Sequence, residues 1–272
     1  MNVFITIFTP TYNRAHTLER LYESIKNQRC CTFEWVVVDD GSTDETERLV
    51  NSWRLASAED FSIRYFKQEN SGKHVAWNKG LREARGDIFF PVDSDDYLTE
   101  HALESIVNMV ETVRSPQDDN IIAVSGTRCF PGNRLTGGIL QSSTEQYIDY
   151  SSIDRRYEGI KGDLSEAFFT EKLRRYPFPV IDDEKFVPEA VVFNRFSNDG
   201  MLIRGFSDPL YCCEYMDDGY TKNTDRLLIR NWKGYRLYIN ELMRSPTKIK
   251  AKVIPFCGFC YRAVLKLFRI VR

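Results

Sequence analysis

The chain has 272 residues, of which 42% are hydrophobic and 28% are charged, and its net charge at pH 7 is −2. This composition excludes a disordered chain, and the near-neutral charge argues against a general nucleic-acid binder, so we expect no nucleic-acid partner. The length allows one large α/β domain that can bury a sizeable core without cross-links.

The first 130 residues alternate between strand and helix patterns. Short β-branched or aromatic runs predict strands at residues 3–8, 34–38, 63–66, 87–92 and 121–124. Apolar residues at helical spacing predict helices at residues 18–25, 42–53, 73–85 and 103–110. We expect Ser42 and Glu45 to form a capping box at the start of the second helix, and Gly86 to end the third.

This alternation predicts an α/β fold with a mostly parallel central sheet flanked by helices. Parallel sheets of this kind bind ligands beyond the carboxyl ends of their strands. Each acidic cluster in this half of the sequence follows the end of a predicted strand. We therefore expect the functional site along that edge of the sheet.

The sequence changes character after residue 126, where Gly, Ser, Arg and Tyr become frequent and periodicity weakens until about residue 180. We divide the chain into an α/β half at 1–130, a smaller region with long loops of the same domain at 131–247, and a tail at 248–272. Short helical patterns at 188–197 and 225–243 predict helices in the second region.

Asp93-Ser94-Asp95 follows the fourth predicted strand directly, with Asp96 next in sequence. Two carboxylates at this spacing can meet one hard divalent cation, and Mg²⁺ and Mn²⁺ both favour oxygen ligands. Such a cation could stabilise the charge of a departing diphosphate. The alternative interpretation is a turn with an N-cap, for which the same composition is common.

Two further clusters follow the second and third strands. Asp39-Asp40-Gly41-Ser42 could accept the N–H of a nucleotide base, or could form a plain β–α turn. The second cluster is Asn70-Ser71-Gly72-Lys73, with Asn78 further along, and it places a glycine hinge, a lysine cation and an amide at the start of a helix, where phosphates bind favourably. The alternative interpretation is an ordinary loop. The order of the three clusters, each at the end of a strand, favours a nucleotide site.

In these stretches the sequence resembles family 2 glycosyltransferases, which have the type A glycosyltransferase fold of nucleotide-diphospho-sugar transferases. The resemblance covers about the first 130 residues. The matching stretches are Thr9-Pro10-Thr11-Tyr12-Asn13-Arg14, Val38-Asp39-Asp40-Gly41-Ser42-Thr43-Asp44, Asn70-Ser71-Gly72-Lys73-His74 with Ala76 and Asn78, and Asp93-Ser94-Asp95-Asp96.

The resemblance implies an enzyme that uses a UDP-sugar donor with Mg²⁺ or Mn²⁺ as cofactor. It implies a nucleoside pocket lined by Pro10, Thr11 and Tyr12, with Asp40 holding the base and Lys73 near the uridine and diphosphate. It also implies that Asp93 faces the ribose and sugar and that Asp95 binds the metal, with Asp96 as a substitute ligand. The donor-binding set from the same stretches is completed by Arg14, Asn70, Gly72, Asn78 and Ser94.

An inverting transfer needs a carboxylate that takes the proton of the acceptor hydroxyl. The family often places it in a Glu-Asp pair before a short helix, and the counterpart here is Glu189, with Ala190 in the position of the Asp. Glu184 and Asp183 are rival candidates, and Glu189 could instead be a first-turn helix charge.

The Gln-x-x-Arg-Trp signature of processive family members does not occur in residues 198–245, so we expect one sugar per turnover. The expected acceptor is a glycan or lipid-linked hydroxyl in cell-surface or capsular polysaccharide assembly. The alternatives are a non-catalytic nucleotide-binding or scaffolding member of the fold and a sugar-phosphate nucleotidyltransferase. The latter usually has a Gly-rich loop after the first strand, where this chain reads TPTYNR.

Residues 248–272 contain seven Lys or Arg and no Asp or Glu, so the other 247 residues hold 30 basic against 39 acidic side chains. A helix here would place Arg262, Lys266 and Arg269 on one face, with Cys260, Val264, Leu267, Phe268 and Val271 on the other. We expect peripheral contact with an anionic membrane, or alternatively packing on the protein body. Three cations and a proline make 253–271 a poor spanning segment.

The seven cysteines are an odd number and include two adjacent pairs, which is atypical of a disulfide framework. Cys257 and Cys260 lack a second pair or a nearby histidine to complete a zinc site. We therefore predict reduced, mostly buried thiols. The apolar run at 3–8 is too short for a signal peptide, so we expect a cytoplasmic protein that can lie peripherally on the inner face of the membrane.

Overall fold

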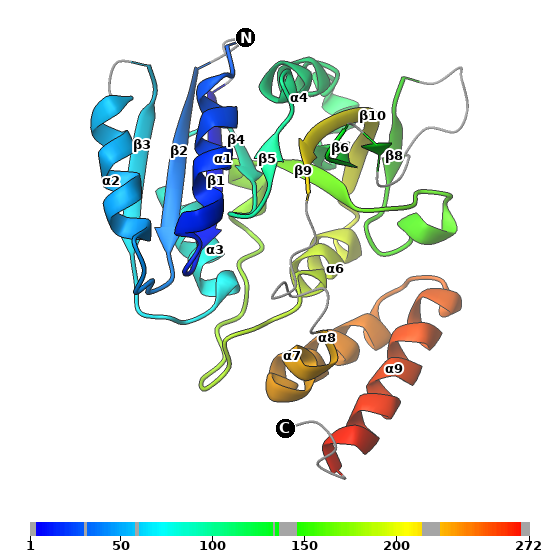
Figure 1. Cartoon of the computed structure of the whole chain (residues 1–272). Helices are drawn as coiled ribbons and strands as arrows, with labels where there is room; N and C mark the ends of the chain where they lie inside the picture. The colour runs from blue at the N-terminus through cyan, green and yellow to red at the C-terminus, as the bar shows by residue number, and fades with distance from the viewer. Residues whose placement is uncertain are drawn as a thin grey trace.

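A mixed β-sheet forms the centre of the molecule in the computed structural model, and helices cover both of its faces (Figure 1). The structure describes residues 4–29, 32–57, 60–132, 134–135, 146–213 and 224–267. In those residues the sheet has ten strands, eight of them in the order β3-β2-β1-β4-β9-β6-β10-β5. The expected α/β fold with a mostly parallel central sheet is confirmed.

The N-terminal half of the sheet is entirely parallel. It consists of β1 (Phe4–Thr11), β2 (Thr32–Asp39), β3 (Ser62–Lys67) and β4 (Ile88–Pro91). Helices α1 (Ala15–Lys26), α2 (Thr46–Ala56) and α3 (Lys73–Glu83) connect these strands. In the register of the sheet, Thr11 lies beside Asp39, and Asp39 beside Lys67. The carboxyl ends of the first three strands therefore form one edge.

The other half of the sheet is mixed because β9 (Leu164–Phe169) lies between β4 and β6 (Ile121–Phe130) and is antiparallel to both. Beyond β6 come β10 (Leu202–Cys212), parallel to it, and the short β5 (Tyr97–Leu98). Two further short strands pair off this path, β7 (Arg134–Leu135) with β6 and β8 (Ile148–Tyr150) with β10.

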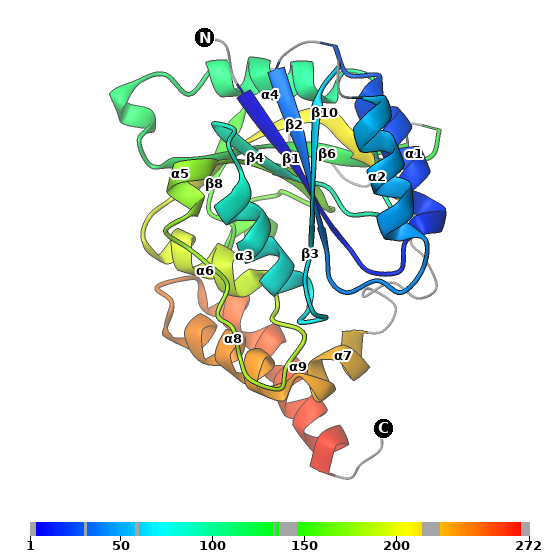
Figure 2. The same cartoon turned by 90° about the vertical axis from the view of Figure 1, so that its left-hand side faces the viewer.

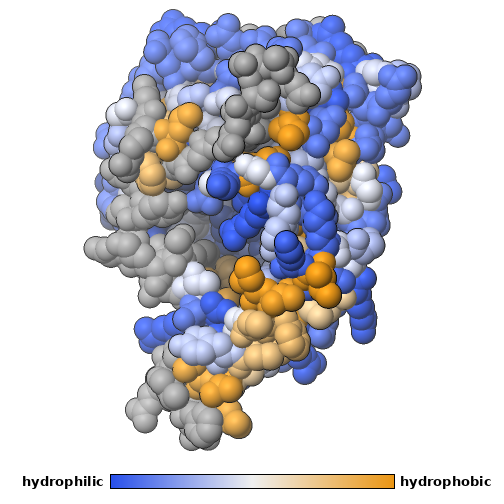
Figure 3. All heavy atoms as spheres, turned by 90° about the vertical axis from the view of Figure 1, so that its right-hand side faces the viewer, coloured by the Kyte–Doolittle hydropathy of each residue, from blue (hydrophilic) through white to orange (hydrophobic). Residues whose placement is uncertain are grey.

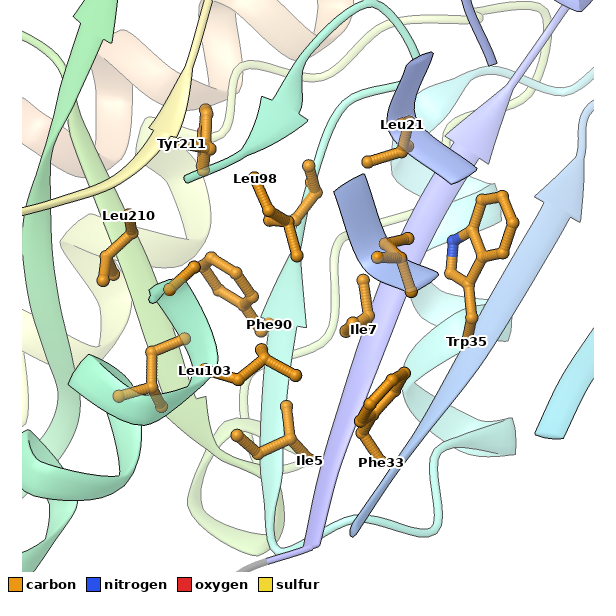
Figure 4. Packing of buried hydrophobic residues seen from close by; sticks show 14 of the residues in the cluster. Ile5, Ile7, Leu21, Phe33, Trp35, Phe90, Leu98, Leu103, Leu210 and Tyr211 are labelled. Carbon is orange, nitrogen blue, oxygen red and sulfur yellow. The ribbon is translucent and has the colours of Figure 1, made fainter. Parts of the chain in front are cut away.

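Apolar side chains fill the space on each side of the sheet. Figure 4 shows one cluster, where Ile7 and Trp35 of the parallel strands pack with Leu21 of α1 and with Leu103 of α4 (Ala102–Glu111). On the opposite face Phe8 stacks on Phe89 with ring centroids 5.0 Å apart. Burial of these large side chains on both faces fixes the sheet and hence the edge that carries the acidic clusters.

The chain after β9 is mainly helical. It contains α5 (Thr170–Leu173), α6 (Ala190–Asn198), α7 (Thr224–Arg230), α8 (Trp232–Arg244) and α9 (Ile249–Leu267). Helix α6 covers the sheet, and α7, α8 and α9 form a separate layer beyond α6 (Figure 2). The single helix expected at 225–243 is divided at Asn231, whose side-chain oxygen accepts the N–H of Lys185. No helix in the described ranges is long and apolar enough to cross a membrane.

Two local predictions about helix ends are wrong. Helix α2 begins at Thr46 without a capping box, because the Ser42 hydroxyl accepts the N–H of Asn13 at 2.9 Å. Helix α3 ends at Glu83, three residues before Gly86. A side chain at Gly86 would place its Cβ 2.5 Å from the backbone nitrogen of Thr6, so the glycine allows close approach of β1 instead of ending the helix.

The prediction of reduced, mostly buried thiols is also wrong. Cys129 and Cys212 form a disulfide between neighbouring strands, where the register places them side by side with Cα atoms 4.4 Å apart. Cys257 and Cys260 are exposed thiols, whereas Cys213 is a buried one. Cys30 and Cys31 lie outside the described residues. The pairing joins cysteines 83 positions apart, and their spacing in the sequence contains no sign of it.

Candidate functional site

The loops after β1 and β2 are tied together at the carboxyl edge of the sheet. Asn13 has a left-handed backbone (φ 52°), and its side-chain oxygen accepts the N–H of Thr43 at 2.9 Å. Asp40 donates its own N–H to the carbonyl of Thr11 at 2.8 Å. These bonds hold the segment at residues 10–14 in place and leave Tyr12 48% exposed at the edge.

Asp40 is buried beneath the loop that follows β3. One carboxylate oxygen accepts the N–H of Ser71 and the side-chain amide of Gln68, both at 2.8 Å, and the other accepts the N–H of Gly72 at 2.7 Å. Gly72 has φ 99°, and a Cβ there would lie 2.0 Å from the carbonyl oxygen of Lys185, so no other residue fits. Asp40 therefore positions the Asn70–Gly72 loop, and its contact with a base stays a prediction.

Asp93, Asp95 and Asp96 form a second acidic cluster after β4. One carboxylate oxygen from each lies within 4.8 Å of the others. Burial and the neighbouring Asp93 charge raise the pKa of Asp96 to about 8, and the same two causes raise the pKa of Asp95. Mutual repulsion of this kind is what a bound cation relieves, and three convergent carboxylates fit a hard divalent metal. Of the cluster, Asp93 and Asp95 are partly exposed.

Lys73 connects this cluster to the chain beyond the sheet. Its ammonium group lies 2.7 Å from Asp93 Oδ1 and 2.9 Å from Glu189 Oε1. Burial opposes the charge on Lys73, but the two carboxylates outweigh it and hold its pKa well above the ordinary value. Burial likewise opposes ionisation of Asp93, yet Lys73 and Arg128 hold the pKa of Asp93 below its usual range. Lys73 is therefore a fixed cation between two acids 96 positions apart.

Glu189 is the N-cap residue of α6, and its side chain is half exposed beside Lys73. Its rival Glu184 has another role. Both carboxylate oxygens of Glu184 accept backbone N–H groups at 2.6 Å, from Lys233 and Gly234 in the first turn of α8. Asp183 is exposed in a left-handed turn (φ 67°). Among the described residues, Glu189 is the only one of the three candidate bases that forms an ion pair with a residue of the acidic edge.

The remaining predicted residues divide into two groups. Pro10, Thr11 and Ser94 are buried at the edge, and Arg14 lies near Asp95, where its positive charge partly opposes the rise in the pKa of that carboxyl. Asn78 was expected to bind the donor, and this stays a prediction. Its amide bonds both the N–H and the carbonyl of Phe178 at 2.9 Å, so it joins α3 to a segment 100 positions away.

The sequence patterns miss two charged residues that lie beside the cluster. Arg128 of β6 donates to the carbonyl of Leu164 at 2.8 Å and lies over the ring of Tyr211, and its charge acts on Asp93 and Asp96. Burial raises the pKa of Glu166 of β9 to about 7, and the charges of Arg155, Arg128 and Glu189 act on it. Arg128 and Glu166 both occur in the middle of a strand, where charged residues are uncommon because they are seldom buried. This position in the sequence could have marked them as candidate site residues.

The chain is similar to a known family over most of its sheet. The family model described as glycosyl transferase family 2 matches residues 6–168. A Campylobacter jejuni protein named GalNAc(5)-diNAcBac-PP-undecaprenol beta-1,3-glucosyltransferase is 33% identical over 105 residues, 38% of this chain and 33% of the relative. An uncharacterized glycosyltransferase of Haemophilus influenzae is 32% identical over 152 residues, 55% of this chain and 56% of the relative. The chain thus spans about a third to a half of these two relatives.

Solved structures share the fold. The crystal structure of S. aureus TarS 1–349 in complex with UDP-GlcNAc has a TM-score of 0.67 and 19% identity, covering 95% of this chain and 72% of that one. The mannosyltransferase PcManGT from Pyrobaculum calidifontis, in complex with GDP-Man and Mn²⁺, has a TM-score of 0.58 and 22% identity, covering 96% and 69%. At these identities the likeness concerns the fold alone.

Proposed function

Because the chain belongs to glycosyl transferase family 2, we propose that it transfers a single sugar from a UDP-sugar to an acceptor hydroxyl, with inversion and with Mg²⁺ or Mn²⁺ as cofactor. The observation that carries the proposal is the line of groups from Asp95 and Asp96, through Asp93 and Lys73, to Glu189. It joins a cation site to a half-exposed carboxylate at one edge of the sheet.

In this proposal Asp95 and Asp96 hold the metal, which would neutralise charge on the diphosphate when bound. Lys73 and Asp93 form the adjoining wall where the diphosphate and sugar would lie. Tyr12, exposed beyond β1, offers a flat surface for the base, next to the loop that Asp40 fixes. Support comes from the similarity in fold to a protein whose structure holds UDP-GlcNAc.

Glu189 is proposed as the base. The acceptor oxygen would attack the anomeric carbon and lose its proton to a Glu189 oxygen, while the bond to the UDP oxygen breaks and UDP takes the electron pair. The ion pair with Lys73 at 2.9 Å holds the Glu189 carboxylate beside the acidic cluster, where the acceptor hydroxyl would lie in this proposal.

The acceptor is proposed to be a glycan or lipid-linked saccharide of a cell-surface or capsular polysaccharide. The name of the Campylobacter jejuni relative, which acts on an undecaprenol-linked saccharide, supports the lipid-linked form. No residue of the described chain is assigned to the acceptor beyond Glu189.

The first test is thermal unfolding with UDP, with and without Mg²⁺ or Mn²⁺. UDP should raise the melting temperature only when the metal is present, and Asp95→Ala should abolish this dependence. Hydrolysis of a panel of UDP-sugars would then identify the donor. An exposed carboxylate elsewhere supplies the matched control, Glu171→Ala in α5, which should leave both readouts unchanged. A UDP-induced shift that is the same in EDTA would contradict the metal-dependent proposal.

A further inference from the structure

Helix α9 turns its cations toward the protein. The Arg262 guanidinium lies 2.6 Å from Asp225 of α7 and donates to the Tyr235 hydroxyl of α8 at 3.2 Å. The Lys266 ammonium donates to the carbonyl of Ile229 and lies 5.0 Å from the ring centre of Trp232. Arg262 and Lys266, two of the three cations expected on the basic face, are therefore used to dock α9 on its neighbours, and Arg269 lies outside the described residues.

The opposite face of α9 is apolar and exposed. At 100° per residue, its exposed members fall within one continuous arc of the helix. They are Ile249, Val253, Ile254, Phe256, Cys257, Cys260, Tyr261, Val264 and Leu267. Figure 3 shows apolar residues gathered on the lower part of the molecule, where α9 lies. We call this set of nine residues the outer face of α9.

Single exposed apolar side chains are common, but a contiguous set of this length marks an interaction site. Ile254 and Leu267 are 72% and 77% exposed, so most of the free energy that burial of these side chains could provide is not realised in the chain by itself. On its inner side, Phe259 packs against Trp232 and Tyr235 of α8, and Ala251 is buried. The outer face is thus left for something outside the described chain.

Charge decides between the two simplest occupants. Residues 248–272 contain seven cations and no acid, and Lys250 and Lys252 lie in the first turn of α9. At 100° per residue Lys250 falls within the apolar arc, and a second copy of α9 would bring no acid to pair with it, because residues 248–272 contain none. Anionic lipid headgroups supply the opposite charge, and the acyl boundary accepts the apolar arc.

We propose that α9 lies parallel to an anionic membrane surface with its outer face in the headgroup and acyl boundary. The apolar residues provide most of the attraction, and the lysines of the first turn add an electrostatic part. The inference goes beyond the proposed transfer reaction, because it concerns the surface opposite the docked cations and uses none of the donor-site residues. It would bring the sheet edge close to a lipid-linked acceptor.

Co-sedimentation of the full chain with vesicles tests the proposal. We expect binding to vesicles of phosphatidylcholine with phosphatidylglycerol, and weaker binding to phosphatidylcholine alone. Ile254→Gln with Leu267→Gln should lower the partition coefficient about tenfold or more, since two exposed side chains would no longer enter the boundary. Leu55→Gln with Val180→Gln, at 83% and 65% exposure elsewhere on the surface, is the matched control and should bind as the natural chain does.

The natural thiols give a second measurement without any substitution. Cys257 and Cys260 lie in the outer face and are exposed, so a water-soluble maleimide should label them in solution. Peptide mass spectrometry should find that anionic vesicles protect both. Equal labelling with and without vesicles, or vesicle binding that the double variant retains, would overturn the proposal.

A natural chain that ignores vesicles, but forms a dimer that the double variant loses, would also overturn it and would assign the outer face to a second copy. Metal-dependent UDP binding is measured on the same samples without vesicles. Its loss would count against the proposed reaction and leave the membrane result to stand by itself.

Discussion

Two acidic clusters lie on either side of β1 at the same edge of the sheet, and the structure uses them in opposite ways. After β2, the Asp40 carboxylate accepts three hydrogen bonds from the next loop. After β4, Asp93, Asp95 and Asp96 face one another. Hydrogen bonds close the first cluster, whereas the second is open and repulsive. Acidic composition at a strand end therefore does not show whether a carboxylate is hydrogen-bonded to a loop, and the positions of the nearby N–H groups do.

The largest expected effect belongs to the open cluster and its extension through Lys73. Glu189→Gln keeps the size of the side chain but cannot take a proton, so kcat should fall about 10²–10⁴-fold. Release of UDP at saturating donor and acceptor measures it. The melting temperature and UDP affinity should stay close to those of the natural chain. A kcat within about twofold of the natural value would remove Glu189 as the base.

Substitution of Asp40 in the closed cluster should lower the stability of the folded protein. Asp40→Ala leaves two buried backbone N–H groups and one side-chain amide without their acceptor, and we expect the free energy of unfolding to fall by about 3 kcal/mol. Urea unfolding measures the loss. Glu45→Ala is the exposed control from the same β–α connection and should change stability by less than about 0.5 kcal/mol. An unchanged midpoint for Asp40→Ala would mean that the carboxylate is not needed to hold the loop.

Glu166 should make the stability of the protein depend on pH. Burial raises its pKa to about 7 in the folded chain, with Arg155, Arg128 and Glu189 around it. Because the folded chain binds this proton more tightly than the unfolded one, the contribution of Glu166 to stability is complete below about pH 4.5 and is lost as the pH rises through about 7.

Between about pH 5 and 8 the unfolding free energy of the natural chain should fall. In Glu166→Gln this fall should be smaller by about 1–2 kcal/mol. Urea titrations in EDTA at several pH values measure the slope. A variant with the same slope as the natural chain would place the titrating group elsewhere.

The smallest effect sharpens the contrast between the clusters. Asp95→Asn removes one of three crowded carboxylates, so in EDTA the protein should gain up to about 1 kcal/mol of stability. In excess Mg²⁺ the natural chain should recover the difference, since the cation relieves the same repulsion. A loss of stability in EDTA would mean that the open cluster is also structural.

The parallel half of the sheet follows from local patterns, because each strand and helix there carries its own periodicity and the β–α order fixes the topology. Asp93, Asp95 and Lys73 could be assigned to one edge for that reason. The Ser42 capping box was predicted from spacing alone. It does not form, because the Ser42 hydroxyl accepts a hydrogen bond from the backbone N–H of Asn13, which lies in another loop.

The missed features depend on distant partners. Asn78 meets Phe178, Cys129 meets Cys212, and Glu184 caps α8, all through contacts that no local pattern encodes. The tail illustrates the same limit. Its described residues fall on the two faces that the sequence predicts, but the contacts with Asp225 and Trp232, which turn the cations toward the protein, could not be read from it.

Strand β9 has a consequence for how such enzymes can be recombined. It comes from the second region of the sequence, yet it fills the gap between β4 and β6, and the family match itself ends at residue 168, inside this strand. A graft that exchanged everything after residue 130 would replace the strand that pairs with both β4 and β6, and a replacement that did not pair with them would leave both open to solvent and to aggregation. Exchange of acceptor specificity between relatives should therefore keep Leu164–Phe169 with the host and join the new segment after it.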